Sequence, residues 1–283
     1  MRGGYNLSTS AAPGADPVAD AREAEALGFD FVCVSDHLHG THPTFETWTV
    51  LAWVAAHTDR VQLVPNVLGL PYRAPAVLAK MAESLHRLSG GRLVLGLGAG
   101  GMDAEFTAFG LNVRSAGEKV EALDDALDIL HGLWRDPAFT YEGRQLRVAG
   151  AEVEPKPETP IPVWIGANGP RVLALTGRKA DGWLPSMAFA PPEVIPERRD
   201  IILEAASTAG RDPAALTFTY NVSVSVGARR EDPRMVSGEA GEVAERLTGL
   251  AELGFHAVNI WPMGDETTQR RALGEQVLPL LAD

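Results

Sequence analysis

The sequence predicts an α/β fold, a (β/α)8 TIM barrel formed as a single domain over residues 1–283. Short apolar runs alternate with stretches of helical periodicity along the chain, and eight such units close a barrel. The runs are almost continuously apolar, which is typical of parallel strands buried on both faces. A chain of 283 residues accommodates one barrel. The alternative for the same pattern is an open, doubly wound sheet.

The strands are predicted from short runs rich in β-branched, aromatic and other apolar residues. The first run is the least regular, because two glycines open it. We expect strands at Gly3–Leu7, Phe29–Ser35, Val61–Leu68, Leu93–Leu97, Pro162–Ile165, Asp181–Leu184, Thr217–Val224 and Ala257–Trp261. Functional residues of a TIM barrel follow the C-terminal ends of its strands, so the residues directly after these runs are the site candidates.

The segments between the strands carry apolar residues at spacings of three and four, which predicts helices. The clearest helix is Glu118–Trp134, in which Val120, Leu123, Leu127 and Leu130 form one stripe. Further helices are predicted at Pro17–Leu27, Pro75–Leu88 and Val243–Leu253, and another begins at Pro170.

Two connections are longer than a barrel requires. One follows the fourth helix, at Asp136–Pro160, and the other follows the sixth strand, at Pro185–Glu197. Long connections of this kind usually carry function or cover a site.

Charge and composition limit the partners and the location of the protein. Lysine and arginine number 25 and acidic residues 37, so the net charge is 25 − 37 = −12. This acidic balance argues against a nucleic acid or an anionic membrane surface as partner. Cys33 is the only cysteine, which excludes an internal disulfide. No apolar run approaches the roughly 18 residues of a spanning helix, and we expect a cytoplasmic protein.

Asp36 and His37 directly follow the second predicted strand. An acid–imidazole pair at a strand end suits proton transfer, and the alternative is a capping aspartate beside a hydrogen-bonded histidine. His39 and His42 lie in the same loop, either in a substrate pocket or as polar loop residues. Their spacing is compatible with metal ligation, but the other histidines fall on predicted helices or at the start of a strand. We therefore predict no metal site.

Two glycine-rich turns follow the fourth and fifth predicted strands. The first reads GLGAGG over Gly96–Gly101, and the second reads GANGPR over Gly166–Arg171, where a helix begins. Backbone N–H groups in such turns and at a helix N-terminus bind phosphates. Two of these turns at one end of a barrel predict a phosphate site, and the alternative is two tight turns without a ligand.

The sequence lacks the residues that several other classes of enzyme require. The four lysines lie outside the predicted strands, which argues against a Schiff-base aldolase, and Cys33 lies within a strand as a core residue. No nucleophile elbow, HExxH or P-loop motif is present. Aromatic residues near the predicted barrel mouth suit a flat apolar cofactor; they are Tyr72, Trp183, Phe189 and Trp261.

These residues belong to a longer pattern that resembles the luciferase-like monooxygenase superfamily, and within it the branch that uses the deazaflavin coenzyme F420. The resemblance covers about residues 20–260. Its most specific run is RLSGGRLVLGLGAG followed by EF and FG. The other matching stretches are EAEALGFDFVCVSDH, NVLGLPYRAPAVLAKMAESLH, FTYEGRQ, PVWIGANGPRVLALTGRKADGW and GEVAERLTGLAELGF.

The resemblance implies a (deaza)flavin whose ring lies over the strand ends. It implies that a bulge with a non-proline cis peptide backs the ring, at the bond between Asn66 and Val67, followed by Leu68. Asp36 matches a residue near the ring, and His37 matches an acid/base beside the substrate. The phosphate side of the cofactor would meet two turns, formed by Gly98, Ala99 and Gly100 and by Gly166, Ala167, Asn168 and Gly169.

The chain departs from relatives that oxidise sugar phosphates. Those relatives carry a glutamate where Gly101 stands here, and the basic residues for their substrate have no match on the corresponding strands. A tryptophan used by several relatives after the Asp-His pair is absent from residues 38–43. These differences argue against sugar-phosphate oxidation and leave the substrate open.

The predicted function is hydride transfer between C5 of coenzyme F420 and a small organic substrate, through a C=C, C=N or alcohol/carbonyl group. His37 would move the proton, while Asp36 would hold the imidazole or a cofactor group. One alternative is an FMN-dependent two-component monooxygenase, and another is a barrel that binds a flavin without catalysis. The resemblance also implies a homodimer that associates through the helices after the early strands.

Overall fold

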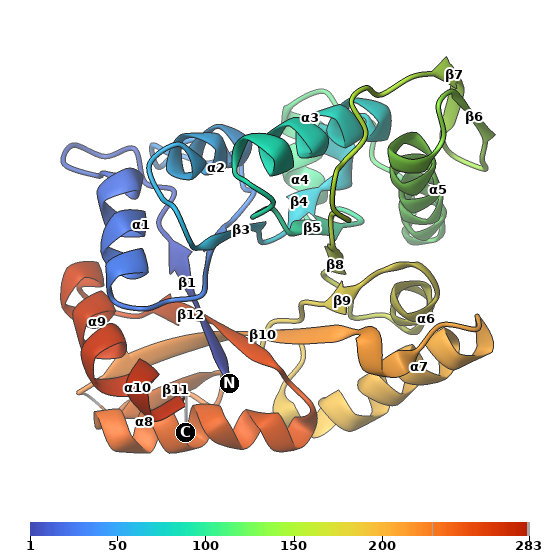
Figure 1. Cartoon of the computed structure of the whole chain (residues 1–283). Coiled ribbons are helices and arrows are strands. Elements are labelled where there is room, and N and C mark those ends of the chain that lie inside the picture. The colour runs from blue at the N-terminus through green and yellow to red at the C-terminus, as the bar shows by residue number, and fades with distance from the viewer. Residues whose placement is uncertain (228, 282–283) are drawn as a thin grey trace.

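In the computed structural model, which describes residues 1–227 and 229–281, the strands form one parallel sheet that curls into a barrel (Figure 1). The strand order is β3-β2-β1-β12-β10-β9-β8-β5-β4, and β11 (Met235–Gly238) pairs with β10 beside this path. The barrel strands are β1 (Arg2–Leu7), β2 (Phe31–Val34), β3 (Gln62–Pro65), β4 (Leu68–Gly69), β5 (Leu95–Gly98), β8 (Val163–Ile165), β9 (Gly182–Trp183), β10 (Thr217–Val226) and β12 (Ala257–Pro262).

Strands β3 and β4 are two pieces of one barrel position, separated by Asn66 and Val67. β3 pairs with β2, β4 pairs with β5, and a parallel bridge joins Leu63 to Leu93. Because this broken strand has a neighbour on each side, the nine segments of the described path close into eight barrel positions. The predicted TIM barrel is confirmed, and the open doubly wound alternative is wrong.

Helices surround the barrel (Figure 1). They are α1 (Pro17–Ala26), α2 (Thr47–Ala55), α3 (Pro75–Leu88), α4 (Asp103–Ala108), α5 (Ala116–Arg135), α6 (Pro170–Lys179), α7 (Ile195–Thr208), α8 (Ala240–Gly249), α9 (Glu266–Ala272) and α10 (Leu278–Leu281). The predicted helices correspond to α1, α3, α5, α6 and α8. Periodicity does not reveal α2, which is apolar almost all round, α7, whose first half has a single buried apolar residue, or α4, α9 and α10, which are short. None of the helices in the described part is long and apolar enough to cross a membrane.

The first long connection forms an antiparallel hairpin of β6 (Phe139–Glu142) and β7 (Arg147–Ala151), which packs on α5. The buried Asp125 carboxylate of α5 accepts hydrogen bonds from the backbone N–H groups of Gln145 (2.7 Å) and Leu146 (2.9 Å). No described residue of this connection lines the cavity presented below. The expectation that it covers the site is therefore wrong, because its polar anchors direct it onto the outer surface of α5.

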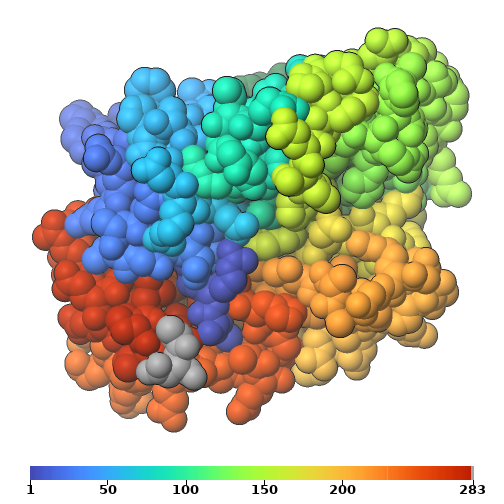
Figure 2. Space-filling model, viewed as in Figure 1, coloured from blue at the N-terminus to red at the C-terminus, as the bar shows by residue number. Residues whose placement is uncertain are grey.

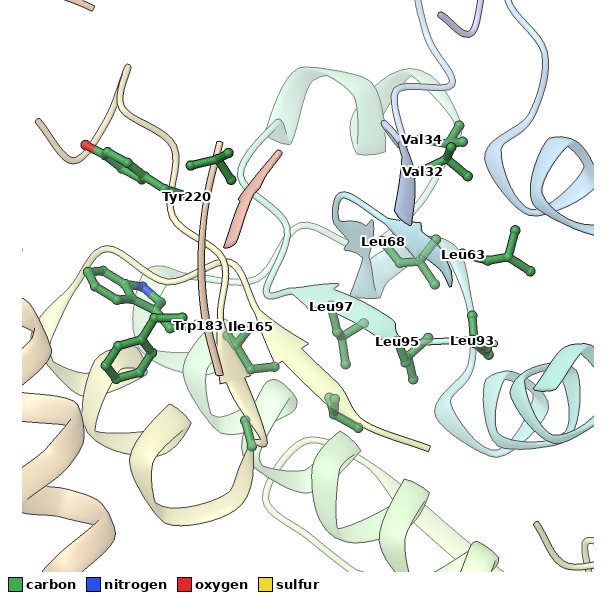
Figure 3. Packing of buried hydrophobic residues seen from close by; sticks show 14 of the residues in the cluster. Val32, Val34, Leu63, Leu68, Leu93, Leu95, Leu97, Ile165, Trp183 and Tyr220 are labelled. Carbon is green, nitrogen blue, oxygen red and sulfur yellow. The ribbon is translucent and has the colours of Figure 1, made fainter. Parts of the chain in front are cut away.

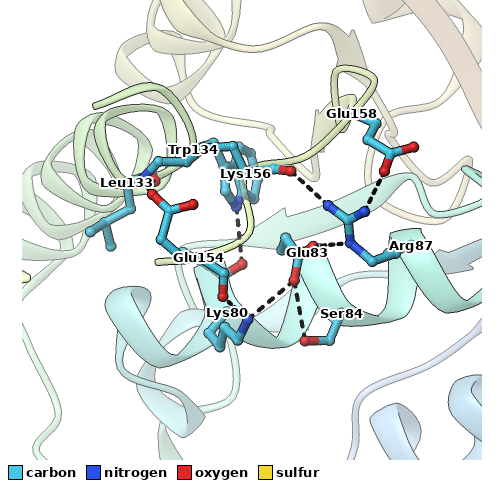
Figure 4. Close-up of polar contacts among 10 residues, drawn as sticks. Lys80, Glu83, Ser84, Arg87, Leu133, Trp134, Glu154, Lys156 and Glu158 are labelled. Carbon is cyan, nitrogen blue, oxygen red and sulfur yellow. Dashed lines mark hydrogen bonds and ion pairs between the residues drawn. The ribbon is translucent and has the colours of Figure 1, made fainter. Parts of the chain in front are cut away.

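The end of the same connection is fastened to α3 (Figure 4). Glu83 of α3, whose side chain is 2% exposed, pairs with Arg87 at 2.6 Å and with Lys80 at 3.3 Å. Arg87 in turn donates to the Lys156 carbonyl (2.8 Å), and Lys80 donates to the Glu154 carbonyl (2.6 Å). These contacts hold the segment that leads into β8 against the barrel.

The core has two apolar layers, because successive strand residues point to opposite faces. In β2, Val32 and Val34 point outward to the helices, whereas Phe31 and Cys33 point into the barrel. Figure 3 shows residues of the outer layer, among them Leu95 and other leucines of neighbouring strands. Cys33 is fully buried, as predicted, and burial raises the pKa of its thiol.

The two ends of the described chain lie side by side (Figure 2). β1 pairs with β12 in parallel, and the Met1 amino group donates to the Leu281 carbonyl at 2.7 Å. This pairing joins the first barrel strand to the last, which a closed barrel requires.

Candidate active site

A cavity of about 720 Å³ opens at the C-terminal ends of the barrel strands. Residues Pro185–Phe189 of the second long connection form part of its wall, as expected for a long connection that covers a site. The predicted site residues that line the cavity are Asp36, His37, Asn66, Val67, Leu68, Tyr72, Gly98, Ala99, Gly100, Gly166, Ala167, Asn168 and Trp261.

Trp183 does not lie in the cavity wall. It is fully buried, its indole N–H donates to the Ala167 carbonyl (2.9 Å), and its ring stacks on Phe255. The prediction that Trp183 contacts a ligand is wrong, because its position on β9 directs the side chain outward into the helix-facing core.

Three further predicted residues are exposed and, among the described residues, are not part of the cavity lining. His39 and His42 lie on the loop after β2, where the His39 ring packs edge-on against Phe109. Gly169 precedes α6 as its N-cap. The structure therefore favours the alternative of loop polar residues for His39 and His42.

His37 is held by Glu105 rather than by the adjacent Asp36. Its Nδ1 lies 2.9 Å from Glu105 Oε1, and the Tyr72 hydroxyl donates to Glu105 Oε2 at 2.8 Å. A carboxylate only accepts hydrogen bonds, so this contact places a proton on Nδ1 and leaves the lone pair on Nε2. The His37 side chain is 60% exposed and lines the cavity, so Nε2 is available to a ligand.

The hydrogen bonds also set the charge of Glu105. Burial by itself raises the pKa of this carboxyl, but the bonds from Tyr72 and His37 outweigh burial and hold the pKa below its ordinary value of 4.5. Burial, together with the bond to Glu105, raises the pKa of the Tyr72 phenol. Near neutral pH Glu105 is therefore ionised and Tyr72 is neutral, which is the state that orients the imidazole.

We expect Glu105→Gln to remove a stabilising contribution that depends on pH. A carboxyl whose pKa is lowered by folding stabilises the native state above its unfolded pKa, and this effect is lost as pH falls through the folded pKa. The difference in free energy of unfolding between wild type and variant, measured with urea, should shrink as the pH falls below about 4.5. A difference that persists unchanged into that acid range would contradict the assignment.

Asp36 holds the segment that follows the broken strand. Its carboxylate, fully buried, accepts from both terminal nitrogens of Arg73 (2.8 and 3.0 Å) and from the Gly69 backbone N–H (2.9 Å). Arg73 also pairs with Glu46, which caps α2. Among the described residues, Asp36 makes no hydrogen bond to His37, because both carboxylate oxygens point toward Arg73.

Sequence reasoning misses Glu105 and Arg73. Glu105 is separated from His37 by 68 positions in the chain, and Arg73 is separated from Asp36 by 37, so no local spacing connects them. Both residues lie within the family-matching stretches, as the R of LPYRAP and the E of the EF pair. That placement is the one sequence signal that pointed to them.

The break between β3 and β4 is a bulge, and its Asn66–Val67 peptide bond is cis, as the resemblance implies. The Val67 side chain fits against three glycines, which are Gly96 and Gly98 of β5 and Gly166 directly after β8. A Cβ at Gly98 would lie 2.8 Å from Val67 Cγ2, and one at Gly166 would lie 2.9 Å from it. A Cβ at Gly96 would collide with the Pro65 carbonyl. These glycines therefore make room for the bulge, in addition to lining the cavity.

We expect Gly98→Ala to destabilise the fold by about 1–3 kcal/mol, because the new methyl group overlaps Val67. Val67→Ala in the same chain should recover most of the loss, since it removes the overlapping methyl. Urea denaturation of the single and double variants measures both effects. Gly101→Ala is the matched control, because a Cβ there meets no atom within 4 Å in the described part of the chain.

The charged groups of the cavity lining already have partners. Asp36 pairs with Arg73, Glu105 with His37, and Arg234 with Asp232 at 3.1 Å. Over residues 1–227 and 229–281, no three or more histidine, cysteine or acidic side chains are grouped to hold a metal ion. The arrangement offers a free imidazole nitrogen between apolar walls, which suits proton transfer beside a flat apolar molecule.

Comparison with known proteins agrees with this geometry. A family model described as luciferase-like monooxygenase matches residues 2–240. The F420-dependent glucose-6-phosphate dehydrogenase of Kineococcus radiotolerans is 31% identical over 98% of this chain and 96% of its own. The enzyme of the same name from Microbacterium testaceum is 30% identical over 91% of this chain and 90% of its own.

The fold has a solved counterpart of nearly the same extent. An F420-dependent secondary alcohol dehydrogenase, solved in complex with an F420-acetone adduct, superposes with a TM-score of 0.89 at 20% identity. The superposition covers 100% of this chain and 99% of that one. With the family model spanning most of the residues, this chain belongs to the luciferase-like monooxygenase family.

Proposed function

We propose that this protein is an F420-dependent oxidoreductase, which transfers a hydride between C5 of the deazaflavin and a small organic substrate. The reacting group is a C=C, a C=N or an alcohol/carbonyl. The named relatives are F420-dependent dehydrogenases. The observation that carries the proposal is the His37–Glu105 pair, which presents a free Nε2 in an open cavity backed by the bulge.

The cavity residues fit a flat ring system with a phosphate tail. Val67, Leu68, Leu184 and Trp261 supply apolar lining. Within the described residues α6 begins at Pro170 without a side-chain cap, two residues after Asn168 of the cavity lining. The N–H groups of its first turn are therefore available to a phosphate.

When bound, coenzyme F420 supplies the carbon that accepts or donates the hydride. The side chains of this protein handle the proton. Nε2 of His37 accepts the hydroxyl proton of an alcohol substrate. In the reverse direction the same nitrogen returns the proton to the oxygen of the carbonyl group that is being reduced. In the neutral imidazole, Glu105 fixes the tautomer that carries its lone pair on Nε2, and it stabilises the imidazolium that forms, while Tyr72 holds the carboxylate.

Asp36 has a different role from the imidazole support that its sequence position suggests. Through Gly69 and Arg73 it holds the backbone after the bulge, which forms part of the cavity wall. We therefore assign Asp36 to the placement of the cofactor-facing segment.

An FMN-dependent monooxygenase is the second candidate, because the matching family model is described as luciferase-like monooxygenase. Carbon at ring position 5 makes a deazaflavin slow to react with oxygen, so cofactor choice decides the reaction type. A flavin-binding barrel without catalysis is less well supported. A barrel without catalysis would not require the exposed His37 imidazole or the buried Glu105 carboxylate that orients it.

Titration of the purified apoprotein with F420 and with FMN tests the proposal. We expect F420 to bind at least about tenfold more tightly than FMN. In a second measurement, a panel of secondary alcohols is added to the F420-bound protein. We expect one of them to reduce F420, which is followed at the visible absorbance band of the cofactor. Glucose 6-phosphate belongs in the panel as the relatives' named substrate, and we expect no turnover, because Arg234 is the one lysine or arginine among the described residues of the cavity lining. Tighter binding of FMN would overturn the assignment.

We also propose a homodimer. Trp53 on α2 and Val77 and Leu88 on α3 are 62%, 57% and 85% exposed, on the helices that follow the early strands. Large exposed apolar side chains on adjacent helices support an interface there. The cytoplasmic location and the single-domain organisation stay predictions from the sequence.

A further inference from the structure

Four asparagine side chains from different barrel positions meet inside the barrel. They are Asn6 of β1, Asn66 after β3, Asn221 of β10 and Asn259 of β12. Nδ2 of Asn66 donates to Oδ1 of Asn221 (2.8 Å) and of Asn6 (3.4 Å). Nδ2 of Asn259 donates to the same two oxygens, at 2.8 and 3.2 Å. Donors and acceptors therefore alternate around a closed square, which we call the amide ring.

The amide ring places polar side chains in the barrel interior, where their burial lowers the stability of the fold. Asn6 and Asn221 are each 6% exposed and Asn259 is fully buried. Asparagine is depleted in strands, and a buried amide destabilises the fold unless every polar atom is bonded. Oδ1 of Asn259 has no hydrogen-bond partner among the described residues. A contribution to stability does not account for this cluster. Buried polar groups that lack a hydrogen-bond partner concentrate at functional sites.

The amide ring connects directly to the bulge. Asn66 is both a ring member and the first residue of the cis peptide, and its backbone N–H donates to the Val34 carbonyl at 2.8 Å. Beyond it, Val67 packs against the glycines of β5 and against Gly166, and the Gly69 N–H donates to Asp36. The bulge is thus fixed at its start by the amide ring and at its end by Asp36.

Two ring members do not themselves face the ligand. Asn66 and Asn221 line the cavity, whereas Asn6 and Asn259 are outside its lining in the described part of the chain. We propose that Asn6 and Asn259 are positioning residues, which act through Asn66 on the bulge and so on how the cofactor is bound. This inference rests on the proposed function for the identity of its ligand, coenzyme F420.

The test compares Asn259→Leu with Thr219→Val in the full-length protein. Thr219 is also fully buried, lies two residues before Asn221 on β10, and has a hydroxyl without a partner among the described residues. Dissociation constants are measured for oxidised and for reduced F420. Substitution of a residue that only stabilises the fold would leave the ratio of these two dissociation constants unchanged. Substitution of a residue that positions the bulge behind the deazaflavin of the cofactor would change the ratio.

We expect Asn259→Leu to raise the dissociation constant of oxidised F420 about tenfold and to change the oxidised-to-reduced ratio at least about threefold. Thr219→Val should leave both within about twofold of wild type. If Asn259→Leu does not fold, Asn6→Ser breaks the amide ring from its acceptor side and is expected to act in the same way. If a variant of the amide ring folds and both of its dissociation constants equal those of wild type, the inference is overturned.

The outcome is separable from that of the proposed function. If the wild-type protein binds FMN in place of F420, the proposed function fails, and the same comparison with oxidised and reduced FMN still tests the amide ring. A wild-type protein that binds neither would overturn both.

Discussion

Replacing His37 with alanine is expected to lower kcat for hydride transfer by about 10²–10⁴-fold and to leave F420 affinity unchanged. The reason is that Nε2 is the free base beside the ligand, since Nδ1 is engaged by Glu105. The imidazole contributes proton transfer rather than binding surface, so the loss falls on kcat. F420 titration and steady-state kinetics with the best alcohol of the panel measure the two effects separately.

His39→Ala is the matched control. His39 is another exposed histidine of the same loop, but it packs on Phe109 outside the cavity lining. Its removal should change kcat by less than about twofold. Full turnover by His37→Ala protein that binds F420 normally would remove His37 from the mechanism.

Replacing Asp36 with alanine is expected to have the largest effect on stability, about 3–5 kcal/mol. The Asp36 side chain is fully buried, and its loss would leave the Arg73 guanidinium, whose side chain is 10% exposed, with Glu46 as its one remaining charged partner among the described residues. The Gly69 N–H would lose its acceptor as well. Because that backbone borders the bulge, F420 affinity should fall together with the free energy of unfolding.

Asp36→Asn and Asp136→Ala separate the contributions. Asparagine retains an acceptor for Gly69 but not the charge, so an intermediate loss is expected. Asp136 pairs with Arg135 at the protein surface, so its removal should leave the free energy of unfolding close to that of wild type. An Asp36→Ala protein as stable as Asp136→Ala in urea would show that the buried pair is not what holds this segment.

Much of the barrel could be predicted because its signals are local. The apolar runs mark the strands whatever their partners are, and the predicted run Val61–Leu68 coincides with β3 and β4. What this run does not show is its interruption at Asn66 and Val67. The bulge depends on space that Gly98 and Gly166 leave from other strands, so only the family resemblance indicated it.

The aromatic residues show the same limit. Trp183 and Trp261 both lie at or near the end of a predicted strand and look equivalent in the sequence. Strand alternation turns Trp183 into the helix-facing core and leaves Trp261 on the cavity wall. A shift of one residue in the position of a strand exchanges these outcomes, and strand ends are the least certain part of a sequence-based assignment.

By itself, the amino-acid sequence determined the barrel, the end of it that carries the site, and the presence there of His37 and the glycine turns. Periodicity and strand-end position are properties of neighbouring residues, which is why they can be read in order along the chain. Only the tertiary structure decided which group holds His37, and that Asn6, Asn66, Asn221 and Asn259 form one ring. Their partners are set by the closure of the sheet, which brings together residues as far as 253 positions apart.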